Sequence, residues 1–314
     1  MPQGDKAKGR RLKVKRGYAY AAITGVLFSL LEPISKIIAD DVDAFSITVI
    51  RFFIGAICLL PSTAIALRKN PASVKKKDLV LLSITGIIMV ALCMPCLQIA
   101  VQTADSPATI AIVFSGNSLF TILLSALFLH ERIRPLQAAA IVLCAVGIAI
   151  CGYPMAPQNV KSIGMALLAA CLFSLYTVIT KKYLVHVNSA ISISLSFLLG
   201  SVVLLLIMSC TRSFSQIAIT PRVAICITIL GVAVTGAGYL AYFAAIKNGG
   251  ASTAAFAFFI KPILAPLTAF LINGAVPTRS VFFAIPFVLL GLALSSYSVR
   301  QQEPAWRKTD PESS

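Results

Sequence analysis

Ionisable residues are rare within the apolar stretches of this sequence, and four stand out: Glu32, Lys36, Arg51 and Lys261. A charged side chain at the centre of a membrane helix costs about 2.5 to 3.5 kcal/mol, so such residues usually face a cavity or pair with an opposite charge. The surplus of cations favours a site for an anionic group such as a carboxylate or phosphate. Because Glu32 adds a place for an amine or a proton, we expect an amino acid or a related carboxylate-bearing metabolite.

The first three of these residues are expected to lie close together near one membrane surface. The predicted first and second helices place Glu32 and Arg51 roughly 10 to 12 Å below that surface, at 1.5 Å per residue. Lys36 lies four residues after Glu32, one turn nearer the surface. Two interpretations stay open: a structural hairpin whose charges neutralise one another, or a site in which Glu32 binds substrate or a proton and Arg51 acts as a gate. Pro33, in LLEPISK, is predicted to bend helix one beside Glu32.

Lys261 lies near the middle of the predicted ninth helix, too deep for its amine to reach the membrane surface comfortably. Pro262 follows it and Pro266 comes one turn later, so we predict that this helix is interrupted or kinked at its centre. Irregular segments at matching depths in two inverted halves mark central binding sites in membrane proteins. We therefore expect Lys261 to face a substrate cavity, with a structural pairing to Glu32 or to a helix-end carbonyl as the alternative.

Neutral polar side chains complete the predicted substrate site: Gln98, Asn117, Tyr176, Tyr239 and Tyr242. Buried Asn and Gln residues join membrane helices by hydrogen bonds more often than they bind ligands, so Gln98 and Asn117 have a structural alternative. Tyr176 lies one residue before the position that corresponds to Glu32 in the repeat described below, which strengthens its candidacy.

Enzymatic and metal chemistry find little support in the sequence. The CMPC segment at residues 93–96 has the spacing of a redox motif, but it lies in a predicted membrane helix and favours packing. The two histidines, His130 and His186, have no second ligand at metal spacing, and no HExxH, GxSxG or Walker sequence occurs. We expect no enzyme activity, no metal and no cofactor.

Composition and hydropathy predict an all-α integral membrane protein. The 314 residues are 58% hydrophobic and 12% charged, with a mean hydropathy of +0.90. Windows of about 20 apolar residues predict ten transmembrane helices, at residues 17–39, 44–67, 79–101, 106–129, 136–152, 163–182, 189–210, 222–246, 251–272 and 279–299.

Charge is distributed unevenly between the two ends of these helices. Most of the Lys and Arg residues lie in the tails and in alternate loops such as RKNPASVKKK, whereas the first loop on the other side is the acidic DDVD. The positive-inside rule places both termini in the cytoplasm of a multi-pass protein of the cytoplasmic membrane. The net charge of +16 thus indicates orientation and contact with membrane lipids rather than nucleic-acid binding. Besides lipids we expect a small-molecule substrate as partner, and a monomer or homodimer.

An internal repeat appears when the sequence is shifted by 145 residues. LFSL at 27–30 then falls on LFSL at 172–175, and Lys36 falls on Lys181. The same shift aligns Gly55 with Gly200 and Gly86 with Gly231. The chain is therefore expected to hold a basic tail (1–16), two five-helix repeats (17–152 and 163–299) and a C-terminal tail (300–314). An odd number of helices per repeat makes the two halves inverted, an architecture typical of secondary transporters that work by alternating access.

Three stretches resemble the two EamA-type units of the drug/metabolite transporter superfamily: TVIRFFIGAICLLP, AVQTADSPATIAIVFSGNSLFTILLSALFLHERIRPLQAAAIVLCAVGIAI and AAIKNGGASTAAFAFFIKPILAPLTAFLINGAVPTRSVFFAIPFVLLGLAL. Arg51 matches an arginine common in the second helix of that family, Lys36 a lysine that often closes its first helix, and Glu131-Arg132 its short ER loop. The chain departs from the family at SGNS (115–118), where proline is frequent, and at Val276-Pro277, where the second unit lacks the ER pair. The resemblance implies a ten-helix metabolite carrier without naming its substrate. A flippase for lipid-linked substrates or a passive channel stays the alternative.

Overall fold

The computed structural model describes residues 3–69, 74–130, 132–153, 157–211, 220–249, 253 and 256–302. Every regular element in these ranges is a helix, as the sequence predicts. Glu131 of the short ER loop and residues 303–314 of the C-terminal tail lie outside the described residues.

The first half of the chain forms membrane-spanning helices, called rods below, some of which consist of two or three consecutive helical segments. These segments are α1 (Gln3–Ser29), α2 (Leu31–Ile37), α3 (Ala44–Lys69), α4 (Lys76–Gly86), η2 (Ile87–Cys93), α5 (Met94–Thr103), α6 (Pro107–Ser115), α7 (Asn117–Leu129) and α8 (Pro135–Cys151). The basic tail is helical from Gln3 and continues into the first membrane rod.

The second half follows the same order. Its segments are α9 (Pro157–Tyr183), α10 (Ser189–Thr211), α11 (Pro221–Thr228), η3 (Ile229–Ala237), α12 (Gly238–Gly249), α14 (Phe256–Asn273) and α15 (Arg279–Gln302). In the described part of the chain, eight rods are long and apolar enough to span a membrane, and two shorter apolar helices, Pro135–Cys151 and Arg279–Ser295, stand at the end of each half. The structure thus confirms the predicted ten-helix membrane fold of two inverted five-helix repeats.

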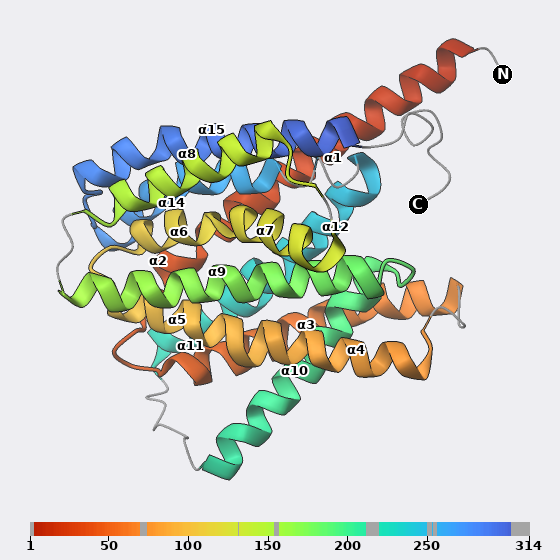
Figure 1. Cartoon of the computed structure of the whole chain (residues 1–314). Helices are drawn as coiled ribbons and strands as arrows, with labels where there is room; N and C mark the ends of the chain where they lie inside the picture. Colours follow the sequence, from red (N-terminus) through yellow and green to blue (C-terminus); the bar gives the residue numbers. More distant parts are fainter. Residues whose placement is uncertain are drawn as a thin grey trace.

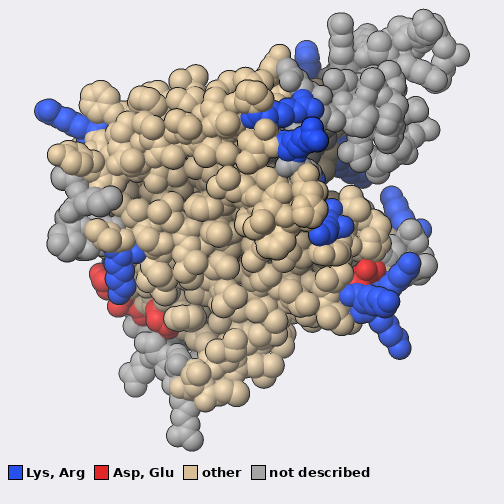
Figure 2. Space-filling view, in the orientation of Figure 1, with Lys and Arg blue, Asp and Glu red and all other residues tan. Residues whose placement is uncertain are grey.

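The long helices lie roughly side by side, and both ends of the chain are found at the same end of the bundle (Figure 1). We call this end the tail face and the other end the opposite face. Most of the visible Lys and Arg lie near the tail face, most of the visible acidic residues lie at the opposite face, and the middle of the visible surface is almost free of charge (Figure 2). Such a band suits contact with lipid tails.

Glycines bring helices into close contact at two equivalent crossings, one for each half. Gly86 lies against Gly200, so a side chain at either position would collide with backbone atoms of the partner helix. Shifting both residues by the repeat gives Gly231 and Gly55, and these lie at the crossing of η3 with α3. Small residues at such interfaces let membrane helices approach closely. The glycines that reveal the repeat in sequence therefore also build its packing.

Both halves also contain a π-helical segment where these crossings occur. η2 covers Ile87–Cys93 in the first half and η3 covers Ile229–Ala237 in the second. The repeat shift carries η2 onto residues 232–238, so the two segments overlap. π-helical turns are rare and occur mostly at functional positions. The sequence analysis did not predict them, because their residues are as apolar as those of ordinary membrane helices.

Candidate functional site

A cavity of about 640 Å³ lies between the two halves. Its walls include residues from α1, α3, α5 and α7 of the first half and from α9, α10, α12 and α14 of the second. At its mouth lie Arg132, Ile133, Val185 and Ser189, which belong to the loops and helix ends of the tail face. No described residue from a loop of the opposite face lines it. The cavity therefore opens toward the tail face and ends inside the bundle.

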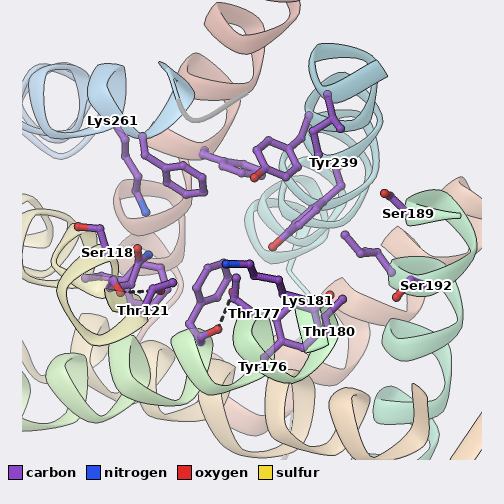
Figure 3. Close-up of a pocket in the computed structure, with 18 of the residues that line it drawn as sticks. Ser118, Thr121, Tyr176, Thr177, Thr180, Lys181, Ser189, Ser192, Tyr239 and Lys261 are labelled. Atoms are coloured by element: carbon purple, nitrogen blue, oxygen red, sulfur yellow. Dashed lines mark hydrogen bonds between the residues drawn. The ribbon is translucent and has the colours of Figure 1, made fainter. Parts of the chain in front are cut away.

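The charged residues that line this cavity are all cationic within the described part of the chain: Arg51, Arg132, Lys181 and Lys261. Its walls are rich in aromatic side chains, namely Phe28, Phe52, Phe114, Phe173, Tyr176, Tyr239, Tyr242, Phe243, Phe258 and Phe259. Figure 3 shows Lys261 and Tyr239 pointing into the same space as Tyr176 and Thr177 on the facing helix, α9. The arrangement suits a ligand that combines negative charge with an apolar body.

Lys261 forms an ion pair with Glu32 inside the bundle. Lys261 Nζ donates to Glu32 Oε1 at 2.6 Å, and the two side chains are 5% and 0% exposed. The contact joins α14 to α2, which pack against each other. Lys261 also lies 5.2 Å from the centre of the Phe114 ring and lines the cavity, whereas Glu32 lies behind it. Lys261 thus both lines the cavity and pairs with Glu32, the two positions that the sequence left as alternatives.

Arg51 does not form the hairpin ion pair expected from the sequence. Glu32 accepts its hydrogen bond from Lys261, because α14 places a compact ammonium group directly against α2. Arg51 Nη2 points instead to the thioether of Met94 at 3.2 Å, and its guanidinium lies 4.7 Å from the centre of the Phe52 ring. Arg51 is only 4% exposed, lines the cavity, and its Nε has no hydrogen-bond partner among the described residues.

Lys36 helps to close the bundle at the opposite face. Its Nζ donates to the carbonyl oxygens of Gln102 at 2.8 Å and Ala104 at 2.6 Å, at the C-terminal end of α5. A cation is favourable there because these carbonyls have no partner within the helix. The side chain of Gln102 in turn donates to the carbonyl of Val42 at 2.8 Å. Among the described residues, the hydrogen bonds of Lys36 therefore go to backbone oxygens rather than to Glu32 or to the acidic loop.

A second contact at the same face ties α11 to the loop after α2. Arg222 Nη2 donates to Asp41 Oδ2 at 2.7 Å and to the carbonyl of Ile37 at 3.1 Å. Together with the bonds of Lys36, this contact links the helix ends and loops of the opposite face.

Most of the neutral candidates meet at the cavity. Asn117, Tyr176, Tyr239 and Tyr242 line it, whereas Gln98 is 3% exposed and lies outside the lining. The side-chain nitrogen of Asn117 has no partner among the described residues, and its backbone carbonyl accepts from the hydroxyl groups of Ser174 and Thr121. Asn117 is therefore a lining residue whose side-chain nitrogen is buried without a partner among the described residues. The side-chain nitrogen of Gln98 is likewise buried without such a partner, but Gln98 lies away from the cavity.

The helix breaks differ from those expected. In the first rod, α1 ends at Ser29 and α2 begins at Leu31, so Pro33 lies in the first turn after a break. Of the two outcomes expected at Pro262 and Pro266, an interruption does not occur, because α14 is helical without a gap across both prolines. A kink there stays a prediction. Prolines are tolerated in membrane helices when neighbouring groups satisfy the freed carbonyls. The break lies instead in the corresponding helix of the first half, at Gly116 between α6 and α7.

The aromatic wall is the main feature that the sequence analysis missed. Phe52 and Phe197 correspond to each other under the repeat shift, and their rings pack edge to face with centres 4.7 Å apart. Met94 and Tyr239 are likewise equivalent, and both line the cavity beside Arg51. The equivalence of these pairs places the inner end of the cavity close to the pseudo-twofold axis. Large apolar residues at matching repeat positions are the signal that could have found this wall.

Comparison with known proteins gives a consistent result. Residues 15–153 and 160–297 each match the EamA-like transporter family. A protein of Clostridium kluyveri named "Uncharacterized transporter" is 31% identical over 91% of this chain and 94% of that protein. One of Pseudomonas aeruginosa, also named an uncharacterized transporter, is 26% identical over 94% of this chain and 95% of its own length. A crystal structure with 19% identity and a TM-score of 0.63 covers 91% of this chain and 99% of that one, and so shares the fold.

Proposed function

Because the chain belongs to the EamA-like transporter family, we propose that it is a secondary transporter for a small polar metabolite that bears a carboxylate, an amino acid or a related compound. It moves this substrate across the cytoplasmic membrane by alternating access. The observation that carries the proposal is the cavity of about 640 Å³, which is lined by cations, open at the tail face and closed at the opposite face. Its size lies within the usual range for sites that bind small molecules, roughly 300 to 1,000 Å³.

The distribution of charge supports an orientation for this state. The tail face is the basic one, so the positive-inside rule assigns it to the cytoplasm. In that orientation the cavity is accessible from the cytoplasm, and the bonds of Lys36 and Arg222 close it toward the outside. Alternating access then requires these bonds to break and the tail face to close.

A passive channel and a lipid flippase make different demands on the same helices. A channel needs a path that reaches both faces, and this cavity reaches one. A flippase needs a lateral opening toward lipid beside its basic residues. The buried ion pair of Glu32 with Lys261 instead lies at a cavity whose described mouth residues belong to the tail face.

Counterflow in liposomes tests the proposal. Purified protein is first screened by thermal shift against amino acids, nucleotides and organic anions, and the compounds that stabilise it are then loaded into liposomes at high concentration. We expect uptake of the labelled compound to saturate and to be accelerated by unlabelled compound inside, with empty liposomes as control. Flux that rises linearly with concentration and ignores the internal compound would identify a channel instead.

A further inference from the structure

We propose that Arg51, rather than Lys261, holds the anionic group of the substrate. We further propose that the substrate is a monocarboxylate with an apolar, preferably aromatic, body and without an ammonium group. The inference rests on the proposed transport function and narrows it, because that function leaves amino acids and simple carboxylates equally open.

The charge balance at the inner end of the cavity leads to this assignment. Lys261 has Glu32 as a direct partner at 2.6 Å, so the pair is neutral overall wherever its proton resides. Arg51 interacts electrostatically with Glu32, whereas the hydrogen bond of Glu32 comes from Lys261. The pair and Arg51 together therefore carry one net positive charge. A monoanion neutralises that charge, whereas a zwitterion leaves it in place.

The guanidinium of Arg51 lacks a strong hydrogen-bond acceptor among the described residues. Its hydrogen bond among the described residues goes to the Met94 sulfur, which is a weak acceptor, and its Nε has none. A buried donor without an acceptor costs free energy, and the cost is higher for a charged group. A carboxylate can accept two parallel hydrogen bonds from a guanidinium, so a ligand at the cavity side of Arg51 supplies the strong acceptor that the Met94 sulfur does not. Asn117 also lines the cavity, and its side-chain nitrogen is a second buried donor without a partner among the described residues.

The surroundings of Arg51 determine what the rest of the ligand must be. The Phe52 ring lies 4.7 Å from its guanidinium, and Phe197 lies 4.7 Å from Phe52, centre to centre. Tyr239 continues this wall, with its ring centre 4.9 Å from that of Phe197. Aromatic pairs at these distances favour a further ring or another apolar group beside them. A carboxylate bound at Arg51 therefore has an apolar body packed against Phe52 and Tyr239, which line the cavity, while the buried Phe197 packs against both rings.

The same cavity is unfavourable for an ammonium group. The carboxylate of Glu32 is fully buried and already bonded to Lys261, and no Asp or Glu is found among the described residues that line the cavity. The charged groups that do line it are cations, which repel an ammonium. An amino acid would thus bring a charge that this site cannot pair.

A set of related probes tests the inference on the full-length protein. We would measure binding and counterflow of 3-phenylpropanoate, L-phenylalanine, 2-phenylethylamine and acetate. They share a phenyl ring or a carboxylate and differ in charge. We expect 3-phenylpropanoate to bind, L-phenylalanine to bind at least about 10-fold more weakly because its ammonium is unpaired, and the amine not to bind. Acetate is expected to bind weakly, because it lacks an apolar body.

Variants separate the anchor from its neighbours. Arg51→Gln is expected to lower the affinity for 3-phenylpropanoate by at least about 30-fold, the usual loss when one partner of a buried charged contact is removed. Arg51→Lys keeps the charge but loses the forked geometry, so its affinity should fall between the two. Arg68→Gln is the matched control, because Arg68 is exposed on the same helix, α3, and does not line the cavity. A melting temperature of ligand-free Arg51→Gln close to that of the wild type shows that the loss is not one of folding.

The outcomes distinguish this inference from the function on which it rests. If L-phenylalanine binds and exchanges as well as 3-phenylpropanoate, or if Arg51→Gln keeps wild-type affinity for 3-phenylpropanoate, the inference is wrong and the transport function stands. If the wild-type protein is folded and exchanges no carboxylate in the probe set or in the wider screen, both are wrong. Binding that follows the predicted order and disappears in Arg51→Gln supports both.

Discussion

In the first half of the molecule, residue 51 is an arginine that lines the cavity, whereas its counterpart in the second half, residue 196, is a serine that does not. The Ser196 hydroxyl lies 3.0 Å from that of Thr85 and joins two helices. Glu32 likewise corresponds to Thr177, and Lys261 corresponds to Gly116. The glycines of the crossings, in contrast, are the same in both halves. The frame, meaning the two sets of five helices and their glycine crossings, is thus nearly symmetric. The charged residues Arg51, Glu32 and Lys261 have no charged counterpart in the other half.

One cation is retained in both halves, and its two copies have different surroundings. Lys36 bonds to backbone carbonyls at the closed face, whereas its counterpart Lys181 lines the cavity near the open face. Two equivalent residues in unequal environments are what alternating access between inverted halves requires. The comparison therefore separates three groups of residues: those at the helix crossings, those proposed to bind the substrate and those proposed to keep one face closed. These three classes should respond differently to substitution.

The largest effect is expected for Lys261→Gln, which removes one member of a buried ion pair. The carboxylate of Glu32 would then be left without a partner in a fully buried position, and such a loss costs about 3 to 5 kcal/mol of folding free energy. Arg51→Gln removes an unpaired cation and should cost far less. Unfolding free energies in detergent measure both.

The double variant Glu32→Gln/Lys261→Gln sharpens this test. With both charges removed, the remaining amides can bond to each other, and most of the stability should return. Equal stability of Lys261→Gln and the wild type would show that Lys261 is not paired in solution, and the distinction between the two buried cations would be lost.

A smaller effect is expected at the glycine crossings of the frame. Gly86→Ala places a methyl group against the backbone of α10, which has little room to move. Overpacking of this kind costs about 1 to 3 kcal/mol. At the equivalent crossing Gly231→Ala meets Cβ and Cγ2 of Ile54, both at 2.8 Å, and because Cβ cannot move without the backbone, a similar cost is expected. Gly164→Ala is the control, because a side chain there meets no atom within 4 Å.

These measurements would also test whether the crossings matter for stability at all. Unfolding free energies that are the same for Gly86→Ala and Gly164→Ala would contradict the close packing. A loss at Gly86 without any loss at Gly231 would show that the symmetry of the frame does not extend to its energetics.

The sequence was sufficient for the frame because the frame depends on local and periodic signals. Apolar runs of membrane length fixed ten helices to within a few residues, and Gly55, Gly86, Gly200 and Gly231 revealed the duplication. The pairings within the site were not predictable in this way. Glu32 and Lys261 are 229 residues apart in sequence, and the choice of Lys261 over Arg51 as partner depends on how α2 packs against α14.

The local backbone conformation within the apolar runs was equally unpredictable from the sequence. Two prolines suggested a break in helix nine, yet α14 is continuous, while Gly116 divides helix four. A proline removes one hydrogen bond, and neighbouring helices decide whether the helix then opens. The π-helical segments have the same composition as their surroundings, so only the three-dimensional packing distinguishes them.

The smallest effect is expected for the surface contact that ties the closed face. Arg222 is 60% exposed at its side chain, so its ion pair with Asp41 contributes only about 0.2 to 1 kcal/mol. Arg222→Gln should therefore leave global stability nearly unchanged and shift the balance toward opening of this face by less than about 5-fold. The readout is the rate at which a membrane-impermeant maleimide modifies a single cysteine introduced at Ser106, after the eight native cysteines are replaced. Ser106 lies at this face, directly before the first residue of α6, and is 8% exposed.

Asp41→Asn provides the matched variant for this contact. Each single substitution should raise the modification rate, and the double variant Arg222→Gln/Asp41→Asn should raise it no further, because both changes remove the same bond. High salt should shrink the difference from the wild type, since exposed ion pairs are screened. If the rate at low salt is unchanged in both single variants, this ion pair does not hold the face closed, and the bonds of Lys36 to the carbonyls of Gln102 and Ala104 must do so without it.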